Sequence, residues 1–210
     1  MNNMFDERQS EIAAALRIPS RLVGRYICLE PLKDRHREEL RIAADDERIW
    51  QHTIGAAHGN RFDDWFEEIK RQITSGRQLP FAVRSVQSGK LVGSTSYFDP
   101  NPRHQRIEIG STWYAPQWWG SQVNPECKLL LLAHAFEILK LNRVSFCTDV
   151  LNARSQAAIE KLGASREGIM RCHMVVQGGR VRDSVLYSII SSDWPRLKKG
   201  IEKRLAKGPA

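Results

Sequence analysis

The sequence predicts an α+β fold, in which helices pack on the faces of a β-sheet. The expected elements come in the order hairpin, strand, buried helix, strand, helix and hairpin, and this mixed order implies a sheet covered by helices. The helix in the middle is apolar on nearly every side, which is typical of a helix buried between layers. The 210 residues suit one domain, or one domain with an extension, and suffice for a sizeable core.

The first third of the chain is expected to hold one strand and two helices. Residues 1–20 look like a short amphipathic extension, and the loose alternation in Tyr26–Leu32 predicts a strand. The charged segment Lys33–Ala44 is a plausible surface helix. Arg61–Ser75 carries aromatic and aliphatic residues at helical spacing, and Gly76 is well placed to end that helix.

The middle of the chain is β-like. Phe81–Val86 and Lys90–Phe98 flank a turn that contains a glycine, which predicts a hairpin. Apolar and polar residues alternate in Arg106–Trp113, which predicts a further strand, and Pro116 ends it.

The buried helix follows this strand. Asn124 is suited to its N-cap and Pro125 to its first position, and its body, Cys127–Leu141, is apolar almost throughout. Arg143–Thr148 is then rich in β-forming residues, and Ala153–Leu162 is expected to be helical.

The chain is expected to end in a hairpin and a basic segment. Arg166–Val176 and Arg180–Ile190 lie on either side of a glycine-containing turn and are predicted to pair. In residues 195–210 the basic side chains are opposed by a single acid, Glu202. We therefore expect a basic tail or solvated helix beyond a domain of residues 21–194.

The composition excludes several classes of protein. A hydrophobic fraction of 41% is ordinary for a soluble globular protein. The longest apolar stretch, Leu129–Ala133, is too short to span a bilayer, and residues 1–20 lack the continuous apolar run of a signal peptide. No membrane association is therefore expected.

The cysteines indicate a reduced environment. They contain no C-x-x-C pair, and no histidine lies at ligand spacing around them. We interpret them as small buried residues of a cytoplasmic protein, and we expect no metal site. The cysteines are Cys28, Cys127, Cys147 and Cys172.

The net charge of +8 indicates an anionic partner, which is a nucleic acid, a membrane surface or a small molecule. No base-stacking or groove-reading motif supports a nucleic acid, so this partner is disfavoured. A small anionic molecule is the simpler explanation.

The segment Gln117–Val123 carries the first chemical signal. It joins a strand to the N-terminus of the buried helix, where unpaired backbone N–H groups and the helix dipole both favour an anion. Gly120 permits a positive φ or a close approach of the backbone to a ligand. By itself, a glycine in such a turn is a weak indication of a phosphate site.

A longer ordered pattern strengthens this signal. It comprises Pro116–Val123, the run N-x-x-S-x-x-A within Asn152–Ile159, the triplet Leu162–Ala164 and the run E-G-x-x-R over Glu167–Arg171. In this pattern the chain resembles the GNAT N-acetyltransferases, and within them the RimJ/RimL-like branch of ribosomal-protein N-terminal acetyltransferases. The resemblance covers residues 21–194. It implies the GNAT fold, a central mixed and mostly antiparallel twisted sheet with helices on both faces, and it implies acetyl-CoA as the acetyl donor.

The resemblance also implies where the cofactor lies. The family's turn has the form Gln/Arg-x-x-Gly-x-Gly/Ala, and Gln122 stands where glycine or alanine is usual, although its backbone donor is retained. The pantetheine is expected between two splayed strands, Arg106–Trp113 and Arg143–Thr148. The expected cofactor-binding residues are Gln117, Trp119, Gly120, Ser121, Gln122, Val123, Asn152 and Ser155.

Two residues are expected to carry the proton transfers. By resemblance, Glu108 is the base that takes a proton from the acceptor ammonium, directly or through water. Ser155 is the acid that protonates the departing thiolate. Many relatives use a tyrosine for this step, but position 162 is leucine here, which favours Ser155.

Alternatives to these roles stay open at this point. Glu108 is also explained as an outward-facing strand residue paired with Arg106. Asn152 and Ser155 are both suited to capping a helix, and one residue can serve both purposes. The substitution at Gln122 motivates an alternative function, a non-catalytic regulatory module that binds acyl-CoA.

The acceptor is expected to be a primary amine, either a protein N-terminus or a small molecule, because family membership fixes the donor better than the acceptor. Its walls are expected from Trp50–Arg61, Phe98–His104 and the hairpin around Gln177. A homodimer is common among such relatives. Four charged residues are expected either to form a surface ion network or to contact an anionic acceptor: Arg171, Arg180, Arg182 and Asp183.

Overall fold

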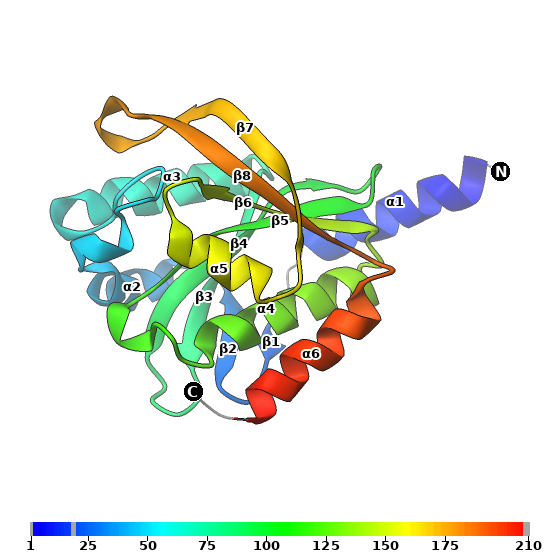
Figure 1. The fold of residues 1–210 in the computed structure, drawn as a ribbon, viewed down its shortest axis with the longest axis horizontal. Coiled ribbons are helices and arrows are strands. Elements are labelled where there is room, and N and C mark those ends of the chain that lie inside the picture. Colours follow the sequence, from blue (N-terminus) through cyan, green and yellow to red (C-terminus); the bar gives the residue numbers. More distant parts are fainter. Residues whose placement is uncertain (1, 18–19, 208–210) are drawn as a thin grey trace.

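The computed structural model describes residues 2–17 and 20–207, and within these ranges eight strands form one sheet (Figure 1). Their spatial order is β1-β2-β3-β4-β5-β6-β8-β7. The pair β5–β6 is parallel and the other neighbouring pairs are antiparallel, so the predicted mixed, mostly antiparallel sheet is confirmed. The strands are β1 (Leu22–Val23), β2 (Ile27–Pro31), β3 (Gln78–Ser85), β4 (Leu91–Asn101), β5 (Arg106–Tyr114), β6 (Arg143–Asp149), β7 (Ser165–Val175) and β8 (Val181–Ile190).

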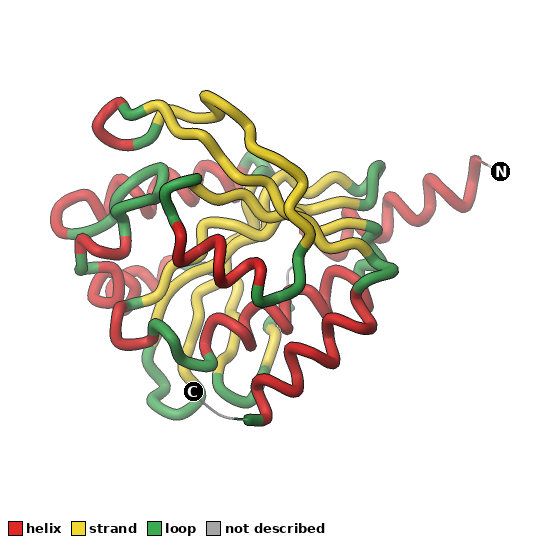
Figure 2. Tube along the Cα trace, in the orientation of Figure 1, coloured by secondary structure: helices red, strands yellow, loops and turns green. Residues whose placement is uncertain are grey.

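Helices pack against both faces of this sheet, and Figure 2 shows the strands running between them. Helices α1, α4, α5 and α6 share the larger hydrophobic core with the sheet, and α2 and α3 share a second core on the opposite face. The predicted α+β class is therefore confirmed. The helices are α1 (Asn2–Arg17), α2 (Arg37–Ala44), α3 (Phe62–Thr74), α4 (Val123–Ala133), α5 (Ala153–Glu160) and α6 (Trp194–Ala206).

The N-cap of helix α4 lies two residues earlier than predicted. Gln122 is at the N-cap position and Asn124 lies in the first turn, where its Oδ1 accepts a hydrogen bond from the Tyr114 hydroxyl at 3.3 Å. The prediction of Asn124 as the N-cap is therefore wrong. Beyond Ala133 the helix continues as a π-helical turn, His134–Ile138. As predicted for an all-round apolar helix, α4 contributes several fully buried side chains to the larger core.

The segments expected on either side of the domain also contribute to its core. Trp194, Leu197, Ile201 and Leu205 form the buried face of α6, so the basic side chains of this segment occupy the other face of an amphipathic helix. Glu137 accepts hydrogen bonds from the Trp194 indole at 2.7 Å and from Lys198 at 2.8 Å. Parts of the expected extension and tail, residues 1, 18–19 and 208–210, lie outside the described ranges.

The cysteines do not share one environment. Cys28 and Cys127 are buried as expected, but Cys147 is half-buried and Cys172 is exposed. The prediction of four buried cysteines is wrong for these two. Cys172 lies in an irregular stretch of β7, where its φ is +49° and the pairing with β8 shifts register. That irregularity turns side chains away from the alternation on which the prediction rested.

Candidate active site

The one parallel pair of the sheet opens after three residues. Strands β5 and β6 are paired at Arg106↔Arg143, Ile107↔Val144 and Glu108↔Ser145. Beyond these pairs β5 continues along β4 and β6 continues along β8. Backbone groups facing the gap between the two strands are free to bind an extended ligand in the manner of an added strand.

The turn that follows β5 presents backbone donors next to this opening. Gly120 has a φ of +73°, and a Cβ placed there would meet open space. In the described part of the chain, no protein acceptor pairs with the backbone N–H of Gly120, Gln122 or Asn124. Three such donors at the N-terminus of a long helix form a favourable place for a phosphate anion.

Side chains hold this turn in shape. The Ser121 hydroxyl donates to the Trp118 carbonyl at 2.6 Å and accepts from the Val123 N–H at 3.3 Å. Gln117 lies exposed in the preceding 3₁₀ turn, Pro116–Trp118. Ser121 therefore shapes the turn through its side chain, and the unpaired donors on either side of it are left for a ligand.

A buried carboxylate anchors the start of α4 to the far edge of the sheet. Glu126 accepts the backbone N–H groups of Arg25, Tyr26 and Ile27 at 2.7, 2.6 and 2.7 Å. A Cβ at Gly24 would lie 2.5 Å from its carboxyl carbon, so the chain passes this carboxylate closely. The sequence marked Glu126 only as an acid at the positive end of a helix dipole, because its partners lie about a hundred residues away.

The indole of Trp119 packs between the end of β5 and two arginines. Its N–H donates to the Tyr114 carbonyl at 2.9 Å, and the Arg154 guanidinium lies over its ring, 3.6 Å from the centroid. The Arg48 guanidinium lies 6.0 Å from the same centroid. Arg48 is paired with Asp46 at 2.6 Å, so Arg154 is the cation beside the turn that complements an anionic ligand. Sequence reasoning did not single out Arg154, although it lies within the N-x-x-S run.

Asn152 and Ser155 lie at the start of α5, beyond the end of β6. The Asn152 Oδ1 accepts the backbone N–H of Ser155 at 3.0 Å, so Asn152 is the N-cap of α5. The capping interpretation is confirmed for Asn152. Among the described residues, no protein group pairs with the Ser155 hydroxyl, which leaves it free to act on a ligand.

Glu108 lies on β5 at the last pair before the strands part. Burial raises the pKa of its carboxyl, the charge of Asp99 raises it further, and Arg182 and Arg106 lower it. No ion pair forms between Glu108 and Arg106 in the described part of the chain, so the expected alternative finds no contact to support it. A carboxylate that ionises nearer to neutral pH is suited to general-base catalysis.

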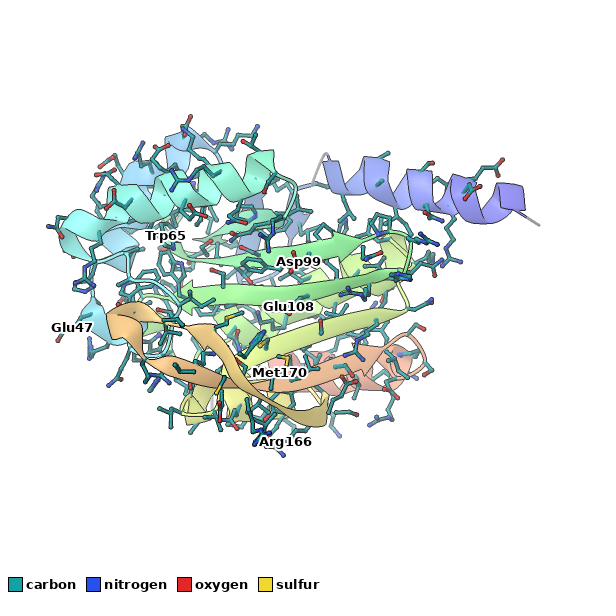
Figure 3. All side chains as sticks on the ribbon, turned by 90° about the horizontal axis from the view of Figure 1, so that it is seen from above. Glu47, Trp65, Asp99, Glu108, Arg166 and Met170 are labelled. Atoms are coloured by element: carbon teal, nitrogen blue, oxygen red, sulfur yellow. The ribbon has the colours of Figure 1, made fainter. Side chains whose placement is uncertain are left out.

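Glu108 shares its face of the sheet with polar side chains from β6, β7 and β8. The pairing register places Glu108, Cys147, Ser184 and Arg182 on the face opposite the larger core. We call this surface the acceptor face. Figure 3 looks onto it and shows Glu108 between Trp65 of α3 and Met170 of β7.

The hairpin of β7 and β8 closes the far side of the acceptor face. The Gln177 side chain donates to the Trp50 carbonyl at 2.7 Å, and its backbone N–H donates to the Ile54 carbonyl at 3.1 Å. A cavity of about 390 Å³ lies at this junction. The contact brings together two of the three segments expected to wall the acceptor. The cavity is lined by Glu47, Arg48, Trp50, Gln51, His58 and Gln177.

Three tryptophans from separate elements contact one another. The Trp113 ring lies 5.2 Å from that of Trp50 and 5.7 Å from that of Trp65, centroid to centroid. Within the second core, all three pack together. The indole N–H of Trp113 is buried and has no partner among the described residues. Core packing therefore accounts for most of this cluster.

The part of the chain that the structure describes shows neither a metal-binding cluster nor a membrane-spanning helix. No cluster of three or more histidine, cysteine, aspartate or glutamate side chains is arranged to hold a metal ion. No helix in the described ranges is long and apolar enough to cross a membrane.

Known proteins resemble this chain over most of its length. The model of the acetyltransferase (GNAT) domain matches residues 27–165. YdaF of Bacillus subtilis (strain 168), named provisionally as a ribosomal N-acetyltransferase, is 29% identical over 170 residues, which are 79% of this chain and 90% of YdaF.

Solved structures of acetyltransferases also superpose on most of this chain. A GCN5-related N-acetyltransferase from Brucella melitensis superposes with a TM-score of 0.82 at 30% identity, covering 89% of this chain and 85% of that one. RimJ of Mycobacterium smegmatis, solved in complex with CoA-disulfide, gives a TM-score of 0.74 at 19% identity and covers 90% of this chain and 96% of its own. At that identity, the likeness to RimJ shows the fold alone.

Proposed function

The chain belongs to the GNAT acetyltransferase family, as the sequence predicted, and on this premise we propose its reaction and the residues that carry it. Membership makes it an acetyl-CoA-dependent N-acetyltransferase. The proposed reaction transfers acetyl to a primary amine by direct attack, with Glu108 as base and Ser155 as acid. The observation that carries the proposal is the position of Glu108, half-buried at the point where β5 and β6 part.

In the proposed reaction, the Glu108 carboxylate first takes a proton from the acceptor ammonium. The free amine nitrogen then attacks the thioester carbonyl carbon, and a C–N bond forms. The C–S bond breaks, and the thiolate leaves with a proton from the Ser155 hydroxyl. The nitrogen carries a surplus proton after the attack and releases it to water, and a proton from water restores the Ser155 hydroxyl. The proton on Glu108 is then the one net proton that passes to solvent. Direct attack therefore needs no covalent intermediate on the protein.

The proposed cofactor site joins the turn after β5 to the start of α5. The pyrophosphate is proposed to bind the free N–H groups of Gly120 and Gln122, with Arg154 close by. Asn152 is proposed to bind the pantetheine amides with the donor and acceptor capacity left after capping. The other proposed contributors are Gln117, Trp119, Ser121, Val123 and Ser155.

The non-catalytic module was motivated by the Gln122 side chain, which stands where a backbone donor is needed. The backbone N–H of Gln122 is unpaired and so remains available to a ligand, which weakens the case for that module. Protein N-termini stay within the acceptor class because the name of YdaF refers to ribosomal acetylation. The cytoplasmic location and the homodimer stay predictions.

The test is release of CoA thiol from acetyl-CoA in the presence of a panel of amines and N-terminal peptides. We expect Glu108→Gln to lower turnover by about 10²-fold or more, since general-base catalysis contributes roughly that much. Its Kd for acetyl-CoA should not change. Glu202→Gln, at an exposed acid of α6, is the matched control. Unchanged turnover in Glu108→Gln would exclude Glu108 as the base, and acetyl-CoA binding without thiol release for any amine would favour the non-catalytic module.

A further inference from the structure

Arg182 on β8 is a buried cation without a carboxylate partner. The residue is only 5% exposed. Its Nε donates to the Ser184 hydroxyl at 2.9 Å, and its Nη2 lies 3.8 Å from the Cys147 sulfur. Within the described part of the chain, no carboxylate lies at ion-pair distance from it, although its charge lowers the pKa of both Glu108 and Asp149 from further away. Its neighbour Arg180, in contrast, is paired with the buried carboxylate of Asp149.

The buried guanidinium of Arg182 has few hydrogen-bond acceptors and no carboxylate in contact with it. A guanidinium has five N–H donors, and a hydroxyl and a thiol together satisfy few of them. Removing a charge from water is costly unless an opposite charge and good hydrogen bonds replace the solvent. The fold therefore bears this cost in the free protein, and an anion placed against Arg182 would relieve it.

The position of Arg182 indicates which ligand would carry such an anion. Arg182, Ser184, Cys147 and Glu108 lie on the same face of the sheet, on strands β8, β6 and β5. Cys147 lies within the electrostatic reach of both Glu108 and Arg182. A ligand whose amine reaches Glu108 on this face therefore has Arg182 within its own surroundings.

The side chain of His173 lies close to the same two groups as Arg182, the Ser184 hydroxyl and the Cys147 sulfur. The ring nitrogen Nδ1 of His173, on β7, lies 3.0 Å from the Ser184 hydroxyl and 3.8 Å from the Cys147 sulfur. Arg182 and His173 thus converge on the same two groups from opposite strands of the hairpin. His173 is half-buried, so the cluster is accessible from the acceptor face.

We propose that Arg182 binds a carboxylate carried by the acceptor, so that the substrate of this enzyme is an amine with a nearby carboxylate. This inference rests on the function proposed above. One guanidinium without a counter-ion matches one carboxylate, whose two oxygens fit the planar fork of its donors. The nearby Arg180 is already neutralised by Asp149, so the local charge does not suit a dianionic phosphate. The carboxylate belongs either to a free amino acid or to an acidic side chain near a peptide N-terminus.

Matched acceptor pairs test this inference. The first pair is L-alanine and L-alaninamide, and the second is a C-terminally amidated peptide with glutamate at its second position and the same peptide with glutamine there. We expect the carboxylate member of one pair to have a kcat/KM about tenfold or more above that of its neutral partner, the range for a charge-assisted hydrogen bond. The pair that shows the preference identifies the source of the carboxylate.

The variant Arg182→Gln should remove most of this preference, mainly by raising KM for the carboxylate acceptor. Arg166→Gln, at an exposed arginine on the same hairpin, should leave the preference unchanged. We expect Arg182→Gln to fold with a Tm no lower than that of the natural chain, since it removes an unmatched buried charge. Equal kcat/KM values within both pairs of the natural chain would overturn the proposal without any variant.

Other outcomes separate this inference from the proposed function. If Arg182→Gln lowers kcat/KM equally for both members of a pair, Arg182 is a positioning residue for Glu108 and the inference is wrong. If no acceptor releases thiol, the proposed function fails, and binding then decides the inference. In that case the carboxylate member should still raise the Tm of the natural chain more than its neutral partner does, and this difference should vanish in Arg182→Gln. No difference would overturn the inference as well.

Discussion

The cofactor turn and the acceptor face are built in different ways. The turn Gln117–Val123 is made by neighbours in sequence, and its free backbone donors depend on one glycine and one helix start. The acceptor face gathers Glu108, Cys147 and Arg182 from three strands that are far apart along the chain. A local site of backbone groups leaves a motif in the sequence, whereas a site of side chains on separate strands does not.

The two regions also differ in charge. Arg154 stands at the cofactor turn, where phosphate charges are expected, and remains open to solvent beside the Trp119 ring. On the acceptor face Arg182 is buried and Glu108 is half-buried, and the neighbouring Arg180 is paired with Asp149. Variants of the first region should therefore change acetyl-CoA binding, and variants of the second should change acceptor kinetics.

The largest effect is expected where the cofactor turn depends on a distant contact. Glu126→Ala leaves three backbone N–H groups without an acceptor, the buried one of Ile27 and the partly buried ones of Arg25 and Tyr26. We expect a loss of about 3 kcal/mol or more in the free energy of unfolding. The Kd for acetyl-CoA should rise as well, because the start of α4 loses its anchor. Thermal denaturation and acetyl-CoA titration measure the two effects, with Glu202→Ala as the control.

If Glu126→Ala lowers the stability but leaves acetyl-CoA binding unchanged, Glu126 stabilises the fold without shaping the cofactor turn. That result would also contradict the view that this carboxylate positions the phosphate donors.

The second prediction concerns pH and the acceptor face. Burial raises the pKa of Glu108 above 4.5, so kcat/KM should rise with pH through a pKa above the usual carboxyl range. The same shift means that the folded protein loses stability, relative to a variant without this charge, as pH rises through that pKa. Glu108→Gln should therefore raise Tm at pH 7 and have less effect at pH 4.

Kinetics and thermal denaturation across this pH range check both parts of the prediction. A rate that is independent of pH between 4 and 8, or a Tm difference that does not change with pH, would contradict it.

A smaller effect is expected at the start of α5. Asn152→Ala removes the side chain that accepts the Ser155 N–H, and loss of an N-cap costs about 1 kcal/mol of stability. Acetyl-CoA affinity should fall too, if Asn152 also binds the pantetheine. Asn60→Ala, at an exposed asparagine, is the control for both measurements. Loss of stability with unchanged affinity would restrict Asn152 to capping.

The smallest effect is expected at Gln122, where the chain departs from the family pattern. Gln122→Gly restores the usual residue, but the backbone N–H is already unpaired and the residue has a helical φ of −72°. We expect the Kd for acetyl-CoA to change by less than about twofold, well under the factor of ten that 1.4 kcal/mol would give. Binding that becomes tenfold tighter would mean that the Gln122 side chain obstructs the phosphate.

Much of the fold followed from local patterns. Alternation located β5, the content of β-forming residues located β6, and the all-apolar run located α4, because burial shapes the local composition and period of each element. The boundaries were less certain: Asn124 has the chemistry of an N-cap, yet Gln122 takes that position, since the turn is fixed by Ser121 and by the Glu126 anchor. Exposure of Cys172 was missed because a break in strand register leaves no local signal.

By itself, the sequence determined the family, the donor end of the site and the candidates Glu108, Asn152 and Ser155. These follow from residues close together in the chain, whose spacing is kept by one turn or one helix start. Only the tertiary structure decided that Arg182 is buried without a counter-ion, that Glu126 reaches the β1–β2 turn and that the Gln177 hairpin meets the Trp50 loop. Burial and electrostatic partners depend on which strands become neighbours, and that is a property of the folded sheet.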